Sequence, residues 1–229
     1  MFPRVHHLQN AIATPTVLDC ERKRFSGVIY DDAGNICHDS QRTRAEPNEW
    51  QPCDSEQIVP SETKVRTPGK SLYLGHYTGH YGHFLLETLA RLWVIEGQTL
   101  ASSSYDRVVF HPFVHKIPSV DRFSPAKISF AAFGIPSNKV LILKEHQYFD
   151  HLTVPQPLLE INSSVAPALS GVYKQILRHA LLLPTHKVGF LRSLAGWTGV
   201  GELRIYMSRR RARGYHPMIN ERAVERMFR

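Results

Sequence analysis

One stretch of the 229-residue chain, residues 73–96, constrains the fold more than any other. The apolar run at residues 71–74 predicts a short strand, and glycines follow at positions 75, 79 and 82. From His83 the apolar residues recur at steps of three and four, which predicts a helix whose buried face carries Leu85, Leu86, Leu89, Leu92 and Trp93. A strand, a glycine-rich turn and a helix in succession are typical of α/β proteins, which bind ligands where the turn and the helix N-terminus face a crevice.

The following residues repeat this alternation. Apolar and β-branched runs predict strands at residues 106–112, 140–143 and 151–154. Helical periodicity appears at residues 126–133, closed by Gly134, and at residues 168–183. The sequence therefore predicts an α/β fold with a mostly parallel sheet and helices on both of its faces.

Four segments differ in composition. Residues 1–68 are polar and interrupted by prolines, which predicts an irregular N-terminal extension with a few short strands. Residues 69–183 form the predicted main lobe, and the glycines within residues 184–201 indicate a linker. Residues 202–229 contain one predicted strand and the start of a helix, which cannot bury a core of their own. We therefore expect this last segment to be the first βα unit of an incomplete second lobe.

The composition is that of a globular protein, with 42% hydrophobic and 21% charged residues. No apolar run approaches the roughly 18 residues of a membrane-spanning helix, and the N-terminus lacks the apolar core of a signal peptide. We expect a cytoplasmic protein with no integral membrane segment. Cys20, Cys37 and Cys53 are widely spaced, which favours reduced thiols, although one disulfide with one free thiol stays open.

The net charge of +8 is concentrated near the C-terminus. From Arg204 onward, eight arginines stand against Glu221 and Glu225. Such a patch is typical of a site for anions: nucleic acid, a membrane surface or the diphosphate of a nucleotide sugar. Charge alone does not choose among these.

Two motifs carry a resemblance to a known family. The run HYGHFLLETLARLW at residues 80–93 resembles the signature of glycosyltransferase family 61, in which a Gly-His-Phe pattern opens a helix. Residues 205–213, IYMSRRRAR, followed by MINE at residues 218–221, resemble the family's strand ending in Ser-Arg and its Asn-Glu helix start. The resemblance implies a GT-B fold, two Rossmann-like lobes that hold a nucleotide sugar between them. The chain then corresponds to the acceptor-side lobe and the start of the donor lobe, as a fragment or a truncated gene product.

The resemblance also implies a reaction. Members of the family transfer a sugar from a nucleotide sugar to a glycan or another hydroxyl acceptor with inversion, and their donors are UDP-linked N-acetylglucosamine, xylose or arabinose. A role in polysaccharide biosynthesis follows, with no metal cofactor because cationic side chains hold the leaving diphosphate. The resemblance assigns diphosphate binding to Ser208 and Arg209. Asn220 and Glu221 match the family's Asn-Glu pair, which either contacts the nucleotide at the donor site or only caps the next helix. Arg213 is the candidate for a second phosphate contact.

His83 and Glu87 are the predicted catalytic residues. They lie four residues apart on one helix face, so the carboxylate can orient the imidazole or act as the base itself. Alternatively, His83 caps the helix and Glu87 pairs with Arg91, another four residues on. His76, His80, Tyr81 and Arg91 are predicted to line the cleft.

Other functions remain open at this stage. His76, His80 and His83 form an H-x3-H-x2-H pattern that suggests zinc, but the intervening glycines disfavour it and we expect no metal. The arginine run at residues 209–213 suggests a nucleic-acid-binding module, although few aromatic residues accompany it. A non-catalytic anion-binding fragment is a further alternative. We favour a nucleotide-sugar donor and a glycan acceptor as partners, and no nucleic acid.

Overall fold

The computed structural model describes residues 3–16, 18–19, 24–25, 27–41, 51–52, 65–79, 83–113, 119–160 and 164–182. All of them belong to the first of two units, Met1–Leu182 and Leu183–Arg229. The predicted linker at residues 184–201 and the predicted βα unit at residues 202–229 lie outside the described residues.

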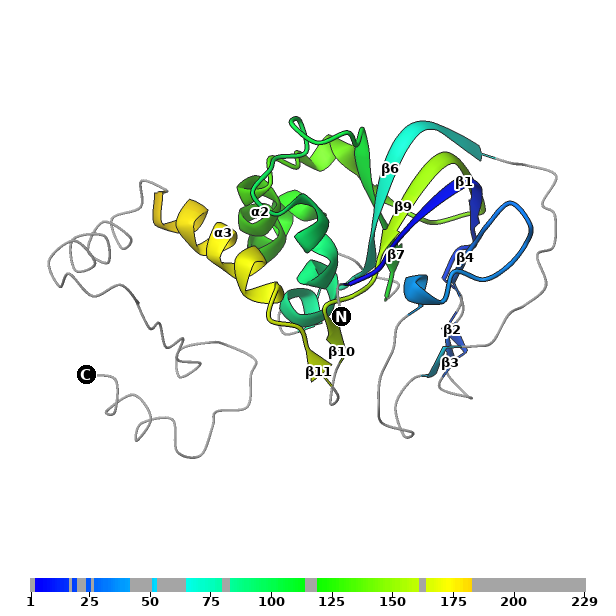
Figure 1. The fold of residues 1–229 in the computed structure, drawn as a ribbon, viewed down its shortest axis with the longest axis horizontal. Coiled ribbons are helices and arrows are strands. Elements are labelled where there is room, and N and C mark those ends of the chain that lie inside the picture. The colour runs from blue at the N-terminus through cyan, green and yellow to red at the C-terminus, as the bar shows by residue number, and fades with distance from the viewer. Residues whose placement is uncertain are drawn as a thin grey trace, which may run out of the picture. The chain divides into compact units, whose positions relative to one another are not determined.

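A curled, mixed, six-stranded sheet forms the centre of this unit (Figure 1), with the strand order β4-β1-β9-β6-β7-β8. Strands β9, β6, β7 and β8 run parallel to one another, whereas β1 runs antiparallel to both β4 and β9. The predicted α/β class and mostly parallel sheet are confirmed. The strands are β1 (Val5–Ala13), β4 (Ile29–Tyr30), β6 (Val65–Tyr77), β7 (Arg107–Pro112), β8 (Val140–Ile142) and β9 (Gln147–Pro155).

The N-terminal segment contributes more to the sheet than the sequence predicted. Residues 1–68 were expected to be an irregular extension, but β1 lies inside the sheet and pairs with β9 from Val5 to Ala13. Its sequence, VHHLQNAIA, is too polar at its start to give a clear strand signal. Among the described residues of this segment, the short strands match the expectation, namely β4, β2 (Leu18–Asp19), β3 (Arg24–Phe25) and β5 (Gln51–Pro52). A 3₁₀ turn, η1 (His38–Ser40), follows β4.

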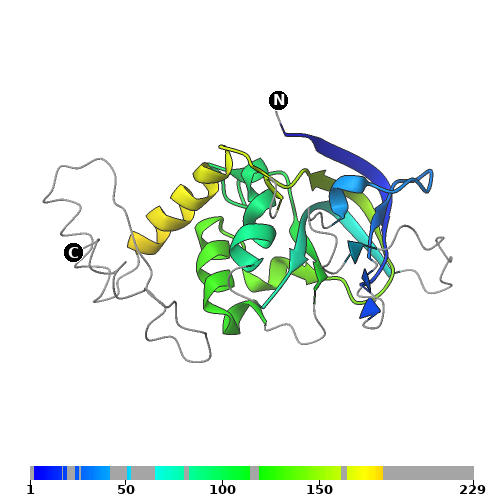
Figure 2. The same cartoon turned by 90° about the horizontal axis from the view of Figure 1, so that it is seen from below.

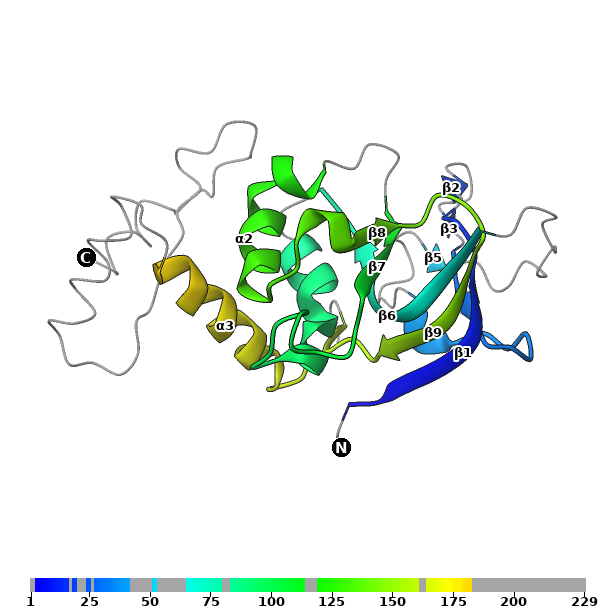
Figure 3. The ribbon, with the colours of Figure 1, turned by 90° about the horizontal axis from the view of Figure 1, so that it is seen from above.

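The longer helices all pack on one face of the sheet. Figure 3 shows them beside β6 and β7, and Figure 2 shows the same arrangement from below. The prediction of helices on both faces is wrong for the described residues, because β8 and β9 are joined only by residues 143–146, too short a connection for a helix. The helices are η2 (Phe84–Thr88), η3 (Leu89–Ile95), η4 (Val120–Arg122), α2 (Ser124–Ala132) and α3 (Leu169–Leu182), with a short turn η5 (Ser137–Lys139) and a small hairpin, β10 (Leu159–Glu160) and β11 (Ser164–Val165).

Two hydrophobic clusters stabilise the opposite faces of the sheet. The first joins β6 and β7 to the helices, and its centre is aromatic: Tyr77, Phe84, Phe110 and Phe130 lie with ring centroids 5.6–6.4 Å apart. The second lies on the face that the N-terminal segment covers, and it consists of Ala11, Ala13, Ile29, Cys37, Tyr73, Val109, Leu143, Phe149, Leu152 and Val154.

The curl of the sheet has a local cause in three neighbouring strands. Asn10 of β1 adopts φ +48°, and the register places it opposite Asp150 of β9. On the other side of Asp150, the pairing of β6 shifts between Thr67 and Lys70, where Gly69 adopts φ +82°. Because the irregularities of β1 and β6 lie on either side of Asp150, on one line across the three strands, the sheet bends there.

Candidate functional site

The carboxyl end of β6 carries the first residues of the candidate site. Although the strand was expected to end before Gly75, it continues through this glycine as a bulge and pairs His76 with His111 of β7. Gly75 adopts φ +88°, and a Cβ at this position would collide with Nη1 of Arg91. The position therefore requires glycine both for its backbone conformation and for space.

His76 lies beside a second histidine that sequence reasoning missed. The imidazole of His111 stacks on that of His76 with a centroid distance of 5.5 Å and an interplanar angle of 27°. Both side chains are buried. His76 was predicted to line an open cleft, and the structure instead places its ring in the sheet beside His111. A signal for His111 was present, since Phe-His-Pro ends a parallel strand next to β6.

His111 also belongs to a buried chain of hydrogen bonds. Its Nε2 lies 2.8 Å from the carbonyl oxygen of Thr14, and its Nδ1 lies 2.8 Å from the hydroxyl of Tyr73. That hydroxyl lies 2.9 Å from the carbonyl oxygen of Ser40. Burial lowers the pKa of His111 to about 4, so its imidazole is neutral at pH 7.

The predicted catalytic pair stands at the start of the next helix. Nδ1 of His83 lies 3.5 Å from Oε1 of Glu87, and their side chains are 33% and 12% exposed. The i,i+4 spacing brings the two groups together as the sequence suggested. His83 makes no side-chain capping hydrogen bond, which argues against the alternative role of a helix cap.

The helix that carries this pair is irregular. It opens with a π turn, η2, in which the N–H of Leu89 donates to the carbonyl oxygen of Phe84, and continues as the 3₁₀ helix η3. The wider turn changes the phase of the side chains, so Leu86, predicted to be buried, is 42% exposed. Two hydrogen bonds connect the π turn to other elements. The hydroxyl of Thr88, within the turn, donates to the carbonyl of His76 in β6 (2.7 Å), and the hydroxyl of Tyr173 in α3 donates to the carbonyl of Leu85 (2.8 Å). Single π turns occur frequently at functional sites.

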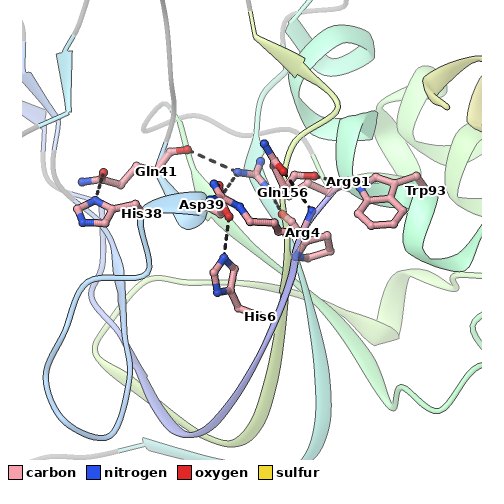
Figure 4. Close-up of polar contacts among 9 residues, drawn as sticks. Arg4, His6, His38, Asp39, Gln41, Arg91, Trp93 and Gln156 are labelled. Carbon is pink, nitrogen blue, oxygen red and sulfur yellow. Dashed lines mark hydrogen bonds and ion pairs between the residues drawn. The ribbon is translucent and has the colours of Figure 1, made fainter. Parts of the chain in front are cut away.

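Arg91 is buried next to Gly75 rather than on the surface of a cleft, and Figure 4 shows its contacts. Its Nε donates to the carbonyl oxygen of Pro155 at 3.0 Å, and its Nη2 donates to the carbonyls of Asp39 at 2.6 Å and Gln41 at 3.5 Å. Burial lowers the pKa of Arg91, and the nearby Tyr73, whose ring centroid lies 5.5 Å from Cζ, opposes this shift. The guanidinium thus joins η3 to the end of β9 and to η1.

Asp39 connects this arginine to the beginning of the chain (Figure 4). Its carboxylate accepts hydrogen bonds from Nη2 of Arg4 at 3.3 Å and interacts with Nε2 of His6 at 2.6 Å. Gln156 links Arg4 to the helix as well. Its side-chain oxygen accepts the backbone N–H of Arg4 at 3.1 Å, and its carbonyl accepts the indole N–H of Trp93 at 3.0 Å. These contacts fix the N-terminal segment against the helix that carries His83 and Glu87.

The remaining predicted site residues lie outside the described residues, namely His80, Tyr81, Ser208, Arg209, Arg213, Asn220 and Glu221. Within the described ranges, no three His, Cys, Asp or Glu side chains gather where they could hold a metal ion. No helix in the part of the chain that the structure describes is long and apolar enough to cross a bilayer.

The chain matches no protein-family model, no curated protein and no solved structure. The resemblance to glycosyltransferase family 61 therefore rests on the two sequence motifs alone.

Proposed function

We propose that the chain belongs to an inverting glycosyltransferase and that His83 is the base that activates the acceptor hydroxyl. The observation that carries the proposal is the His83–Glu87 pair, with its 3.5 Å separation, at the first turn of the helix that follows β6. A partly exposed imidazole next to a largely buried carboxylate has the geometry of a base with an orienting group. The motif that contains both residues is the one that resembles family 61.

The strand order is consistent with a Rossmann-like lobe of GT-B type. Strands β6, β7 and β8 follow one another outward in one direction, and β9 lies on the opposite side of β6. The order in which the parallel strands are added to the sheet therefore reverses at β6, and open α/β sheets bind ligands at such a position, beyond the carboxyl ends of their strands. Arg91 bonds to Pro155 at the carboxyl end of β9, so the helix with His83 begins near this position.

The proposed reaction moves one proton and exchanges one glycosidic bond. Glu87 orients His83 through Nδ1, so that Nε2 accepts the proton of the acceptor hydroxyl. The hydroxyl oxygen then attacks the anomeric carbon as the bond to the nucleotide diphosphate breaks, and the diphosphate leaves with the bonding electron pair. The anomeric configuration inverts, and the Glu87 carboxylate stabilises the imidazolium that forms. The proposal assigns the leaving diphosphate to Ser208, Arg209 and Arg213, with Asn220 and Glu221 at the adjoining helix start.

UDP release tests the proposal directly. The chain is incubated with UDP-linked N-acetylglucosamine, xylose or arabinose and a set of glycan acceptors, and free UDP is measured. We expect acceptor-dependent release that His83→Gln lowers by about 10²–10⁴-fold, as is usual when a general base is removed. Glu87→Gln lowers UDP release less than His83→Gln, because the imidazole keeps its proton-accepting nitrogen. It also changes the pH dependence of UDP release, because the carboxylate no longer stabilises the imidazolium.

A matched control separates catalysis from stability. His146→Gln replaces a histidine in the connection between β8 and β9, at the amino end of β9, and is expected to leave UDP release unchanged. Calorimetric titration with UDP, repeated with Arg209→Ala, tests the donor side independently. If the wild-type chain neither binds UDP at millimolar concentration nor releases it from any donor, the proposed activity of this chain is wrong.

A further inference from the structure

A hollow lies on the sheet beside β1, β9 and β6. It is lined by residues of β1, β9 and β6 and by the loop before β7, and none of the lining residues belongs to a helix. Leu8 and Leu152 belong to the second hydrophobic cluster or pack against it, so their neighbours along β1 and β9 project to the opposite face. Those neighbours include His7, Gln9 and His151.

The lining combines cations with neutral hydrogen-bonding groups. Lys70, His7 and His151 supply nitrogen donors or positive charge, and Gln9, Ser104 and Tyr105 supply an amide, a hydroxyl and a phenol ring. The hydroxyl of Thr153 lies 3.2 Å from Nδ1 of His7 and holds that ring in place. The second ring nitrogen of His7 is not used in this contact.

No carboxylate lines the hollow. Two carboxylates adjoin lining residues along the chain: Oδ2 of Asp106 accepts the backbone N–H of Lys70 at 2.8 Å, and Oδ1 of Asp150, beside His151, accepts Nε of Arg66 at 2.7 Å. The exposed ammonium of Lys70 has no carboxylate partner among the lining residues, so it is available to an anion in the hollow.

The volume limits what the hollow can hold. It measures about 250 Å³, space for about eight water molecules at roughly 30 Å³ each. This is below the roughly 300–1,000 Å³ of sites for drug-sized ligands. A single sugar ring with one charged substituent is the size of ligand that fits.

We propose that this hollow binds a monosaccharide-sized anion, a sugar that carries a phosphate or a carboxylate. Lys70 and His151 contact the anionic group, and Gln9, Ser104 and Tyr105 contact the sugar hydroxyls and ring. The inference does not depend on the glycosyltransferase proposal, because it uses none of the residues near His83 and requires no reaction.

Nuclear magnetic resonance titration of the full chain tests this site. Glucose 6-phosphate and glucuronate are the probes, with neutral glucose and inorganic phosphate for comparison. We expect one of the two charged sugars to bind saturably, at least tenfold more tightly than glucose and inorganic phosphate. The amide signals of Lys70, Ser104 and His151 shift, and Lys70→Met combined with His151→Gln weakens binding at least tenfold.

A matched pair of substitutions provides the control. Lys144→Met combined with His146→Gln removes the same residue types just before β9, outside the hollow, and is expected to leave the affinity unchanged. The proposal is overturned if neither charged sugar binds at 10 mM, or if the shifted signals lie only in other parts of the chain. Equal affinity for inorganic phosphate also overturns it, because the hollow then does not recognise the sugar.

Discussion

The buried histidine His111 is predicted to make the fold sensitive to acid. Its pKa falls from an ordinary value of about 6.5 to about 4 because its ring is buried. The unfolded chain therefore takes up a proton below about pH 6.5, while the folded chain does so only below about pH 4. The stabilisation is fully present above pH 6.5 and is lost as the pH falls from 6.5 to 4.

The size of the effect follows from the same shift. A difference of about 2.5 pKa units corresponds to about 3 kcal/mol, at roughly 1.4 kcal/mol per unit. Urea unfolding at several pH values between 7 and 4, followed by tryptophan fluorescence, measures the free energy of unfolding. We expect the wild type to lose about 3 kcal/mol more over this range than His111→Gln, which carries no titratable group there.

The hydrogen bonds of His111 also fit a charged imidazolium, and a charged ring in the fold would refute the predicted acid sensitivity. A neutral ring that donates from Nε2 to the Thr14 carbonyl can only accept at Nδ1, from the Tyr73 hydroxyl, which then cannot also donate to Ser40. An imidazolium would donate to both Thr14 and Tyr73 and let the hydroxyl of Tyr73 donate to Ser40. If the pH dependence of His111→Gln equals that of the wild type, or the wild type gains stability relative to it in acid, the ring is charged in the fold.

Three further substitutions test the packing around the candidate site, each by the urea midpoint at pH 7. Gly75→Ala is expected to lower the free energy of unfolding by at least about 2 kcal/mol, because a collision with Arg91 adds to the roughly 1–2 kcal/mol cost of a left-handed backbone. Gly97→Ala is the control: Gly97 has φ +75° and open space around it, so this variant is expected to show the backbone cost alone. Phe84→Ala is expected to cost about 3–5 kcal/mol by leaving a cavity among Tyr77, Phe123 and Phe130, whereas Leu86→Ala, at an exposed position of the same turn, is expected to cost much less. Arg91→Met is expected to cost about 3 kcal/mol or more, since it leaves buried carbonyl groups without donors at about 1–3 kcal/mol each; equal stability to the wild type would show that water replaces the guanidinium.

Elements with a strong local pattern were predictable from the sequence. The helix α3, the strands β7 and β9 and the closeness of His83 and Glu87 all follow from periodicity or from an i,i+4 spacing. Gly134, with φ +59°, follows α2 as a helix-ending glycine should. Each of these features depends on residues that are near one another in the chain.

Features that depend on distant partners were not predictable. The strand β1 is stabilised by pairing with β9 at the far end of the unit, which no property of its own sequence reveals. The exposure of Leu86 comes from the π turn, which the hydroxyls of Thr88 and Tyr173 hold through contacts outside the helix. An arginine in an apolar helix face is normally expected to point to solvent, yet Arg91 is buried because three backbone carbonyls meet its guanidinium.

The N-terminal segment therefore supports the candidate site as well as the sheet. Three side chains around the carboxyl ends of β6 and β7 form hydrogen bonds to carbonyl oxygens of residues 14–41: His111 bonds to Thr14, Tyr73 to Ser40, and Arg91 to Asp39. All three side chains are buried, where water does not supply hydrogen bonds. Each carbonyl oxygen therefore provides the partner that the buried polar group needs. Because Arg91 also fills the space behind Gly75, the position of the helix that begins with His83 depends on residues more than forty positions earlier in the chain. A variant that loosens η1 is accordingly expected to displace His83 and Glu87 without touching either.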